Sequence, residues 1–174
     1  MKNIVILCFV VFSTIQIYSQ QNSLEKLQFL IGNWQGKGTG FGNENSTITA
    51  SYKFTLNNKY IEVKHESHFK PTSKKPNGER HIDKGFISFD KVRNKIVYRQ
   101  FNNEGYVNQY VLDEEKSNDS TVVFETETIE NFISGGKARY TIKKITDTEI
   151  ETIFDVSFPN KDYNCFGTNK LLKI

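Results

Sequence analysis

A two-residue alternation of apolar and polar side chains begins after Gly32 and continues to the end of this 174-residue chain. In the clearest segment, 47–56, one side carries Ile48, Ala50, Tyr52, Phe54 and Leu56, and the other side carries Thr, Ser and Lys. This period is typical of a β-strand with one buried face. Asn57-Asn58 follows as a tight turn, because asparagine tolerates positive φ. The chain is therefore predicted to fold mainly from strands.

Ten segments of this kind follow one another with short connections. They are 33–40, 47–56, 61–69, 81–90, 95–101, 106–113, 120–129, 138–146, 149–158 and 164–174. Consecutive strands pair as neighbours, and closure of the sheet removes its exposed edges. We predict an all-β fold, a ten-stranded antiparallel up-and-down β-barrel, with a β-sandwich as the alternative. The connections expected at one end are on the whole longer and richer in Gly and Pro, which predicts an open mouth there; they are 41–45, 70–80, 102–105, 130–136 and 159–163.

The amino-terminal residues have the layout of a secretory signal peptide. A positive start precedes the apolar run Ile4–Phe12, and a polar stretch follows. The run is short for a membrane-spanning helix, which needs about 20 apolar residues, so an uncleaved anchor is the alternative. We expect cleavage near Ser19 or Gln20 and a secreted or periplasmic protein. The organisation is then a signal peptide over residues 1–20 and a single barrel domain over residues 21–174.

A short amphipathic helix is predicted before the first strand. Asn22 and Glu25 have the spacing of a capping box, and Gly32 ends the segment. Apolar residues then repeat at helical spacing, at Leu24, Leu27, Leu30 and Ile31. Because this helix precedes a strand that runs toward the mouth, we expect it to cap the opposite end of the barrel.

The charge and cysteine content of the chain limit the classes of partner and the sources of stability that it can have. The net charge of +3 comes from 23 basic and 20 acidic residues of interspersed sign, which predicts no nucleic-acid surface and, after cleavage, no stable membrane insertion. Only Cys165 would remain after cleavage, so no internal disulfide is possible and a hydrophobic core must stabilise the fold.

The expected site is the barrel interior, lined by inward aromatic side chains and one histidine. The candidate ligand contacts are Trp34, Tyr52, His65, Tyr98, Tyr110, Tyr140 and Phe154. Trp34 has the alternative role of closing the barrel only, and His65 that of a hydrogen-bonded interior residue. Arg99 and Arg139 could hold an acidic ligand group only if their strands turned them inward.

No catalytic or metal site is predicted. Nucleophile-elbow, phosphate-loop and dinucleotide fingerprints are absent from the sequence. His65 and His68 lie three apart on a strand and face opposite sides, and His81 begins another strand. Glu125 and Glu127 share a face that we assign to solvent.

The stretch Gly32-Asn33-Trp34-Gln35-Gly36-Lys37-Gly38 resembles the start of calycin-type barrels. Together with 85–90 and 96–98, it is most similar to the nitrobindin-like haem-binding barrels and to related lipocalin-like domains of unknown function. The resemblance implies a haem ligated by a histidine near the end of the chain. The last strand here has no histidine, and Asn169 or Lys170 stands about where the ligand would be.

We therefore expect no cofactor. If haem binds at all, its ligand should be His65, with Cys165 as the lesser candidate.

The favoured function is an exported barrel that binds a small hydrophobic ligand in its interior. One alternative is an enzyme or a haem-dependent protein for peroxide or nitric oxide on the same barrel. A second alternative is a structural or partner-binding domain whose barrel is filled. No convergent set of titratable residues is visible in the sequence, which favours binding over catalysis.

Overall fold

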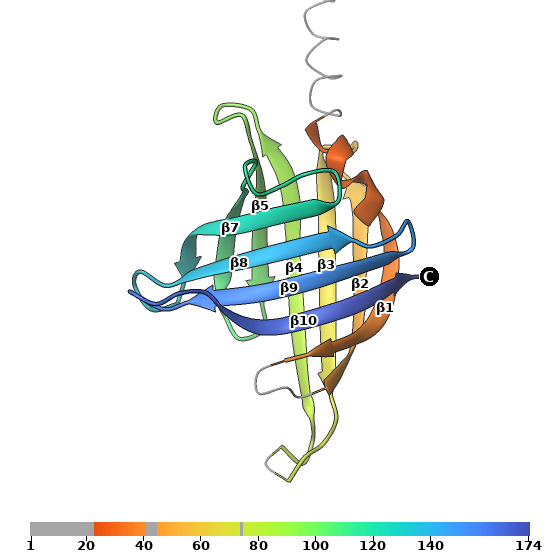
Figure 1. Ribbon diagram of the computed structural model, residues 1–174, viewed down its shortest axis with the longest axis vertical. Coiled ribbons are helices and arrows are strands. Elements are labelled where there is room, and N and C mark those ends of the chain that lie inside the picture. The colour runs from red at the N-terminus through yellow and green to blue at the C-terminus, as the bar shows by residue number, and fades with distance from the viewer. Residues whose placement is uncertain (1–22, 41–44, 74) are drawn as a thin grey trace, which may run out of the picture.

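The protein is a closed barrel of ten antiparallel strands (Figure 1). The computed structural model describes residues 23–40, 45–73 and 75–174, so the expected signal segment lies outside the described residues. Each strand pairs with its neighbours in the sequence, and β1 pairs with β10 to close the barrel. The predicted fold class is confirmed, and the β-sandwich is excluded.

The strand boundaries agree with the alternation to within about two residues at most ends. The strands are β1 Gly32–Thr39, β2 Asn45–Thr55, β3 Tyr60–Phe69, β4 Glu79–Asp90, β5 Lys95–Asn102, β6 Val107–Leu112, β7 Thr121–Glu130, β8 Lys137–Lys144, β9 Glu149–Ser157 and β10 Asn164–Lys173. In the β2–β3 turn, Asn57 and Asn58 both have φ of 60°, as asparagine in a tight turn permits.

The predicted short amphipathic helix is present as η1 (Glu25–Leu30), and it is a 3-10 helix. Leu24, Leu27 and Leu30 are all fully buried, and their spacing of three matches the three residues per turn of a 3-10 helix. The N-cap is Leu24, which makes no side-chain capping hydrogen bond. The expected capping residue, Asn22, lies outside the described residues.

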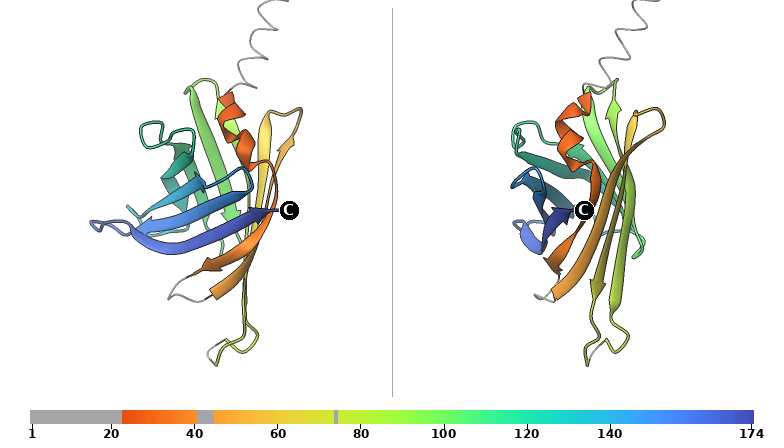
Figure 2. Two further views of the ribbon diagram at one scale, coloured as in Figure 1. Left: turned by 45° about the vertical axis from the view of Figure 1, so that its right-hand side comes forward. Right: turned by 90° about the vertical axis from the view of Figure 1, so that its right-hand side faces the viewer.

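Helix η1 lies over one end of the barrel, and the β3–β4 connection lies at the other end (Figures 1 and 2). Trp34 is buried beside the helix, and its Nε1 donates a hydrogen bond to the carbonyl oxygen of Leu30 at 2.7 Å. The helix therefore caps the end of the barrel opposite the predicted mouth, as the sequence indicated.

Glycines in β1 let the neighbouring strand come close. A Cβ on Gly36 would overlap the carbonyl of Lys170, and a Cβ on Gly38 would overlap the side-chain amide of Asn169. Glycine at these positions therefore permits the close β1–β10 pairing, and Gly38 leaves room for Asn169 on the inner face.

Candidate functional site: a cavity at the open end

A cavity of about 520 Å³ occupies the half of the barrel away from η1. Its volume lies within the roughly 300–1,000 Å³ of small-molecule sites. Strand ends at the mouth supply its rim, for example Thr39, Phe69 and Asn102. The predicted position of the mouth agrees with this geometry.

Four tyrosines from β2, β5, β6 and β8 form a layer at the inner end of the cavity, where Tyr98 and Tyr140 line it. Tyr98 stacks on Tyr110 with ring centroids 5.5 Å apart, and the hydroxyls of Tyr52 and Tyr140 lie 3.4 Å apart. All four are buried, and burial raises the pKa of each phenol above its usual value. They remain neutral hydrogen-bonding groups that separate the cavity from the core beneath.

A polar group from β3, β4 and β10 forms part of the cavity wall. His65 lies directly opposite Asp83 in the sheet register, and its Nδ1 is 3.8 Å from Asp83 Oδ2. On the other side of the imidazole, Asn169 Nδ2 lies 3.5 Å from His65 Nε2 and donates a hydrogen bond to Thr152 Oγ1 at 3.0 Å. The barrel thus brings together three side chains that lie far apart in the sequence.

Burial shifts the titration of both ionisable members of this group. Desolvation lowers the pKa of His65 to about 4, so the imidazole is neutral near pH 7. Desolvation, reinforced by the negative charge of Glu104, raises the pKa of Asp83 to about 7. The site therefore presents a neutral imidazole beside a carboxyl that holds its proton about half of the time near neutral pH.

A second polar group borders the same cavity. Asn108 Nδ2 donates a hydrogen bond to Gln100 Oε1 at 2.9 Å, and the Tyr110 hydroxyl donates to the same oxygen at 3.3 Å. Nearer the rim, His81 Nε2 is 2.8 Å from Glu79 Oε1, and His81 Nδ1 also contacts Glu104. The cavity thus combines an apolar, largely aromatic wall with a few polar groups that could orient a ligand.

Four of the seven candidate residues line this cavity: His65, Tyr98, Tyr140 and Phe154. Tyr52 and Tyr110 belong to the packed tyrosine layer and are not among the lining residues. Trp34 is part of the core at the helix end, which agrees with its alternative role of closing the barrel.

Asp83 is a cavity residue that the sequence reasoning missed. It lies on the inward face of β4 with Gly85 and Ile87, both of which are buried. The alternation of β4 gives Asp83 this orientation, but the sequence alone does not show that His81 and Asp83 both face a cavity.

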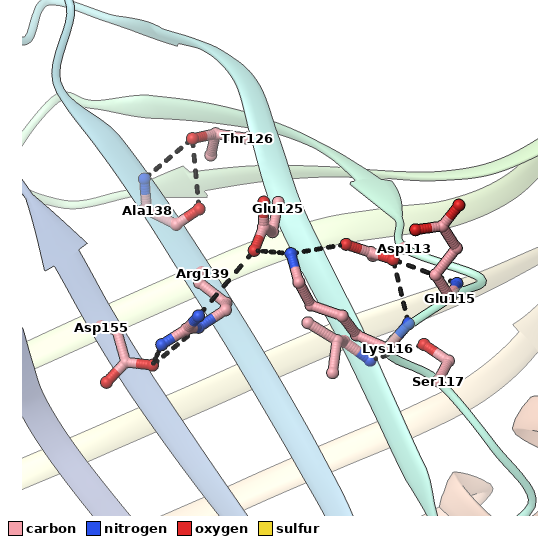
Figure 3. A network of polar contacts seen from close by, with 10 residues as sticks. Asp113, Glu115, Lys116, Ser117, Glu125, Thr126, Ala138, Arg139 and Asp155 are labelled. Carbon is pink, nitrogen blue, oxygen red and sulfur yellow. Dashed lines mark hydrogen bonds and ion pairs between the residues drawn. The ribbon is translucent and has the colours of Figure 1, made fainter. Parts of the chain in front are cut away.

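The arginines that were considered for an acidic ligand group point outward. Arg99 is exposed. Arg139 pairs with Asp155 at 3.0 Å on the outer surface, lies 3.9 Å from Glu125 (Figure 3), and stacks on the Tyr163 ring at 4.3 Å. Neither arginine is available to a ligand in the barrel.

The two glutamates of β7 lie on the outer face of the barrel, as predicted, and each forms an ion pair there. Glu125 is held by Lys116 at 2.9 Å, and Glu127 pairs with Arg93. Cys165 is exposed and is not among the cavity-lining residues, which removes it as a candidate ligand inside the barrel.

Within the described part of the chain, no three His, Cys, Asp or Glu side chains are grouped in a way that could hold a metal ion. None of the described helices is long and apolar enough to cross a membrane.

A closed ten-stranded antiparallel barrel with one end capped and the other hollow defines a calycin-like barrel. Among solved structures, the chain is similar to the crystal structure of Rv2717c from M. tuberculosis, with a TM-score of 0.63 and 12% identity over 87% of this chain and 96% of that chain. At this identity the likeness shows the fold alone.

Two further structures are similar at lower scores. A redesigned β-barrel has a TM-score of 0.42 and 12% identity over 84% of this chain and 93% of that chain. The protein EF1p2_mFAP2b, solved bound to DFHBI, has a TM-score of 0.46 and 11% identity over 85% of this chain and 96% of that chain. No family model matches the sequence, and no curated protein matches it.

Proposed function

We propose that this protein binds a small, largely apolar molecule inside its barrel. The observation that carries the proposal is the cavity of about 520 Å³ between the tyrosine layer and the mouth. A barrel of similar strand number can be filled by its own side chains, and here the mouth half is not. The proposal involves no catalytic step.

The residues that line the cavity suit a ligand with an apolar body and one polar substituent. Phenylalanines such as Phe69, Phe132 and Phe154 would bury its apolar body. The His65–Asp83–Asn169 group would meet a polar substituent and fix its orientation.

Titration with the neutral fluorescent probe N-phenyl-1-naphthylamine tests the proposal. We expect saturable binding with one probe per barrel. Ser67 points into the cavity from β3, so Ser67→Trp should fill the space and weaken binding at least about tenfold, which corresponds to roughly 1.4 kcal/mol. Thr49→Trp is the matched control, because Thr49 is exposed on the outside of β2.

Equal weakening by both tryptophan variants would indicate a general disturbance of the barrel. Absence of saturable binding to the wild type would favour the alternative of a structural or partner-binding domain.

A second candidate function is haem binding, as the nitrobindin-like resemblance implies. The observation that favours it is the neutral imidazole of His65 in the cavity wall, with a carboxyl near its second nitrogen, as is common for metal-bound histidines. At the position in β10 where the resemblance implies a histidine, the inward residue is Asn169, whose amide is a poor iron ligand and already contacts His65 Nε2. His65 would therefore have to displace Asn169 to hold the iron. Bound haem would supply a centre for nitric oxide or peroxide.

Absorbance titration with ferric haem separates this candidate from the first. A Soret shift in the wild type that is lost in His65→Ala would support it. A strong shift that survives this substitution would defeat the assignment to His65, and no shift in either protein would leave the apolar ligand as the function.

We also propose that the protein is exported, on the strength of the apolar run Ile4–Phe12. Secreted or periplasmic material should begin close to Gln20 or Gln21. Amino-terminal sequencing that still reads Met1 would contradict export by cleavage.

A further inference from the structure

The cavity is acidic although the protein as a whole is basic. Its lining includes the carboxyl groups of Asp83 and Glu104, whereas none of the described lining residues is Lys or Arg. The whole chain, by contrast, carries a net charge of +3. The charge that lines the cavity is therefore opposite in sign to the net charge of the whole chain.

Asp83 contributes a carboxyl to the cavity wall from the inward face of β4. No described residue donates a hydrogen bond to its carboxyl, and the nearest basic atom is His65 Nδ1 at 3.8 Å, which is beyond hydrogen-bond range. About a quarter of the side chain is accessible, so its oxygens can meet a ligand.

Two acidic residues on the outside of the barrel, unlike Asp83, form ion pairs with a basic side chain. Asp155, which is 8% exposed, is paired with Arg139, and Glu125 with Lys116 (Figure 3). The Asp83 carboxyl, by contrast, is partly accessible from the cavity and has no hydrogen-bond donor among the described residues, so a donor on a ligand can reach it.

Glu104 adds a second carboxyl near the rim of the cavity. His81 contacts both Glu104 and Glu79, and Glu79 also pairs with Lys75. A cation inside the cavity can therefore approach the carboxyls of Asp83 and Glu104, whereas a carboxylate finds no described arginine or lysine in the lining.

Aromatic rings complete the site, because the faces of aromatic rings attract cations. Rings from several strands line the cavity, among them Tyr98, Tyr106, Phe132, Tyr140 and Phe154. We propose that the ligand is a hydrophobic amine whose nitrogen binds the Asp83 carboxyl while its apolar body lies among these rings, and that fatty acids and other anionic amphiphiles are excluded. This inference rests on the proposed function and deepens it.

The pH dependence of binding has a definite direction. Asp83 faces His65 on β3, Asn102 on β5, the rim pair His81 and Glu104, and the four buried tyrosines beneath. Of these groups, His65 and the tyrosines are neutral near pH 7. Because burial holds the pKa of Asp83 at about 7, the affinity for a protonated amine should rise between pH 6 and pH 8.

Three probes that share one aromatic body provide the test: 1-naphthylmethylamine, 1-naphthylmethanol and 1-naphthoic acid. At pH 8 we expect the amine to bind the purified protein at least about tenfold more tightly than the acid, with the alcohol between them. Asp83→Asn, which keeps the shape of the side chain, should remove most of the preference for the amine over the alcohol. Glu62→Gln is the matched control, because it removes the same charge from an exposed position on the outside of β3 and should leave the preference unchanged.

The two proposals fail in different ways. Binding of the acid as tight as that of the amine, or an amine preference that Asp83→Asn leaves intact, would overturn the amine assignment while cavity binding stands. Absence of binding for all three naphthalenes and for N-phenyl-1-naphthylamine would overturn the proposed function together with this inference.

Discussion

The two halves of the barrel use the same strands for opposite purposes. Toward η1, the inward residues are apolar and tightly packed, as at Ile61, Ile87 and Leu171, each no more than 1% exposed. A few residues further along the same inward faces, β4 carries Asp83 and β10 carries Asn169, both of which line the cavity. The alternation of each strand determines which residues point inward, but position along the strand determines whether they meet the core or the cavity.

The tyrosine layer marks the boundary between these halves. Its rings pack with the core, as in the Tyr98–Phe124 contact at 5.8 Å, and its hydroxyls contact polar partners. Tyrosine suits this position because one end of the side chain is apolar and the other forms hydrogen bonds. The comparison predicts that equal substitutions in the two halves will differ sharply in cost.

The largest difference should come from truncating one phenylalanine in each half. Phe124 is fully buried in the filled half, so Phe124→Ala should lower the free energy of unfolding by about 3–5 kcal/mol. Phe132 lines the cavity near the mouth and contacts Tyr106 and Phe158, so Phe132→Ala should cost only about 1 kcal/mol. Urea unfolding curves measure both, and equal costs would break the distinction between a packed and a hollow half.

The second prediction concerns pH and the hollow half alone. The pKa of Asp83 rises from its ordinary 3.8 to about 7 on folding. Ionisation of Asp83 therefore lowers the free energy of unfolding, by an amount that is absent below pH 4 and grows as the pH rises to 7. Asp83→Asn should therefore stabilise the protein at pH 8 by about 2–4 kcal/mol. The control Glu62→Gln should change stability little.

The same logic has the opposite sign for His65. Its pKa falls from 6.5 to about 4 on folding. The unfolded chain therefore takes up a proton more readily than the folded protein, and the free energy of unfolding falls as the pH falls from 6.5 toward 4. Between pH 4 and 6.5 the two groups oppose each other, and the Asp83→Asn variant should show a rise of stability with pH that is partly masked in the wild type. Parallel stability–pH curves for wild type and variant would contradict the assigned shifts.

The smallest predicted effect lies at the capped end. Trp34→Phe removes the indole donor to the Leu30 carbonyl and leaves that oxygen unpaired, which should cost about 1–3 kcal/mol. Because Trp34 is remote from the cavity lining, the dissociation constant of N-phenyl-1-naphthylamine should not change. A loss of affinity at unchanged stability would instead place Trp34 in the ligand site.

Much of this architecture could be predicted from the sequence because strand alternation is a local signal. The segment 47–56 predicted β2 (Asn45–Thr55) to within two residues, and the glycine-rich and proline-containing connections predicted the open end. The short helix was also predictable, but its type was not, because leucines spaced three apart, together with Ile31, fit either an α-helix or a 3-10 helix.

The site was less predictable because it depends on depth within the barrel. Tyr52 and Tyr98 have the same inward phase, yet only Tyr98 lines the cavity. The contact of His65 with Asn169 joins residues 104 positions apart. It follows from barrel closure, which no local pattern encodes.

The seam between β1 and β10 has a consequence for how the molecule folds. Six residue pairs, from Trp34–Lys173 to Thr39–Thr168, join the first strand to the last. During synthesis the growing sheet keeps an unpaired edge until the final strand arrives, and contacts between such distant segments are slow to form. Pairing of β1 with β10 is therefore the step that completes the cavity wall at Asn169. A chain that loses β10 would leave the edges of β1 and β9 exposed to association with other chains.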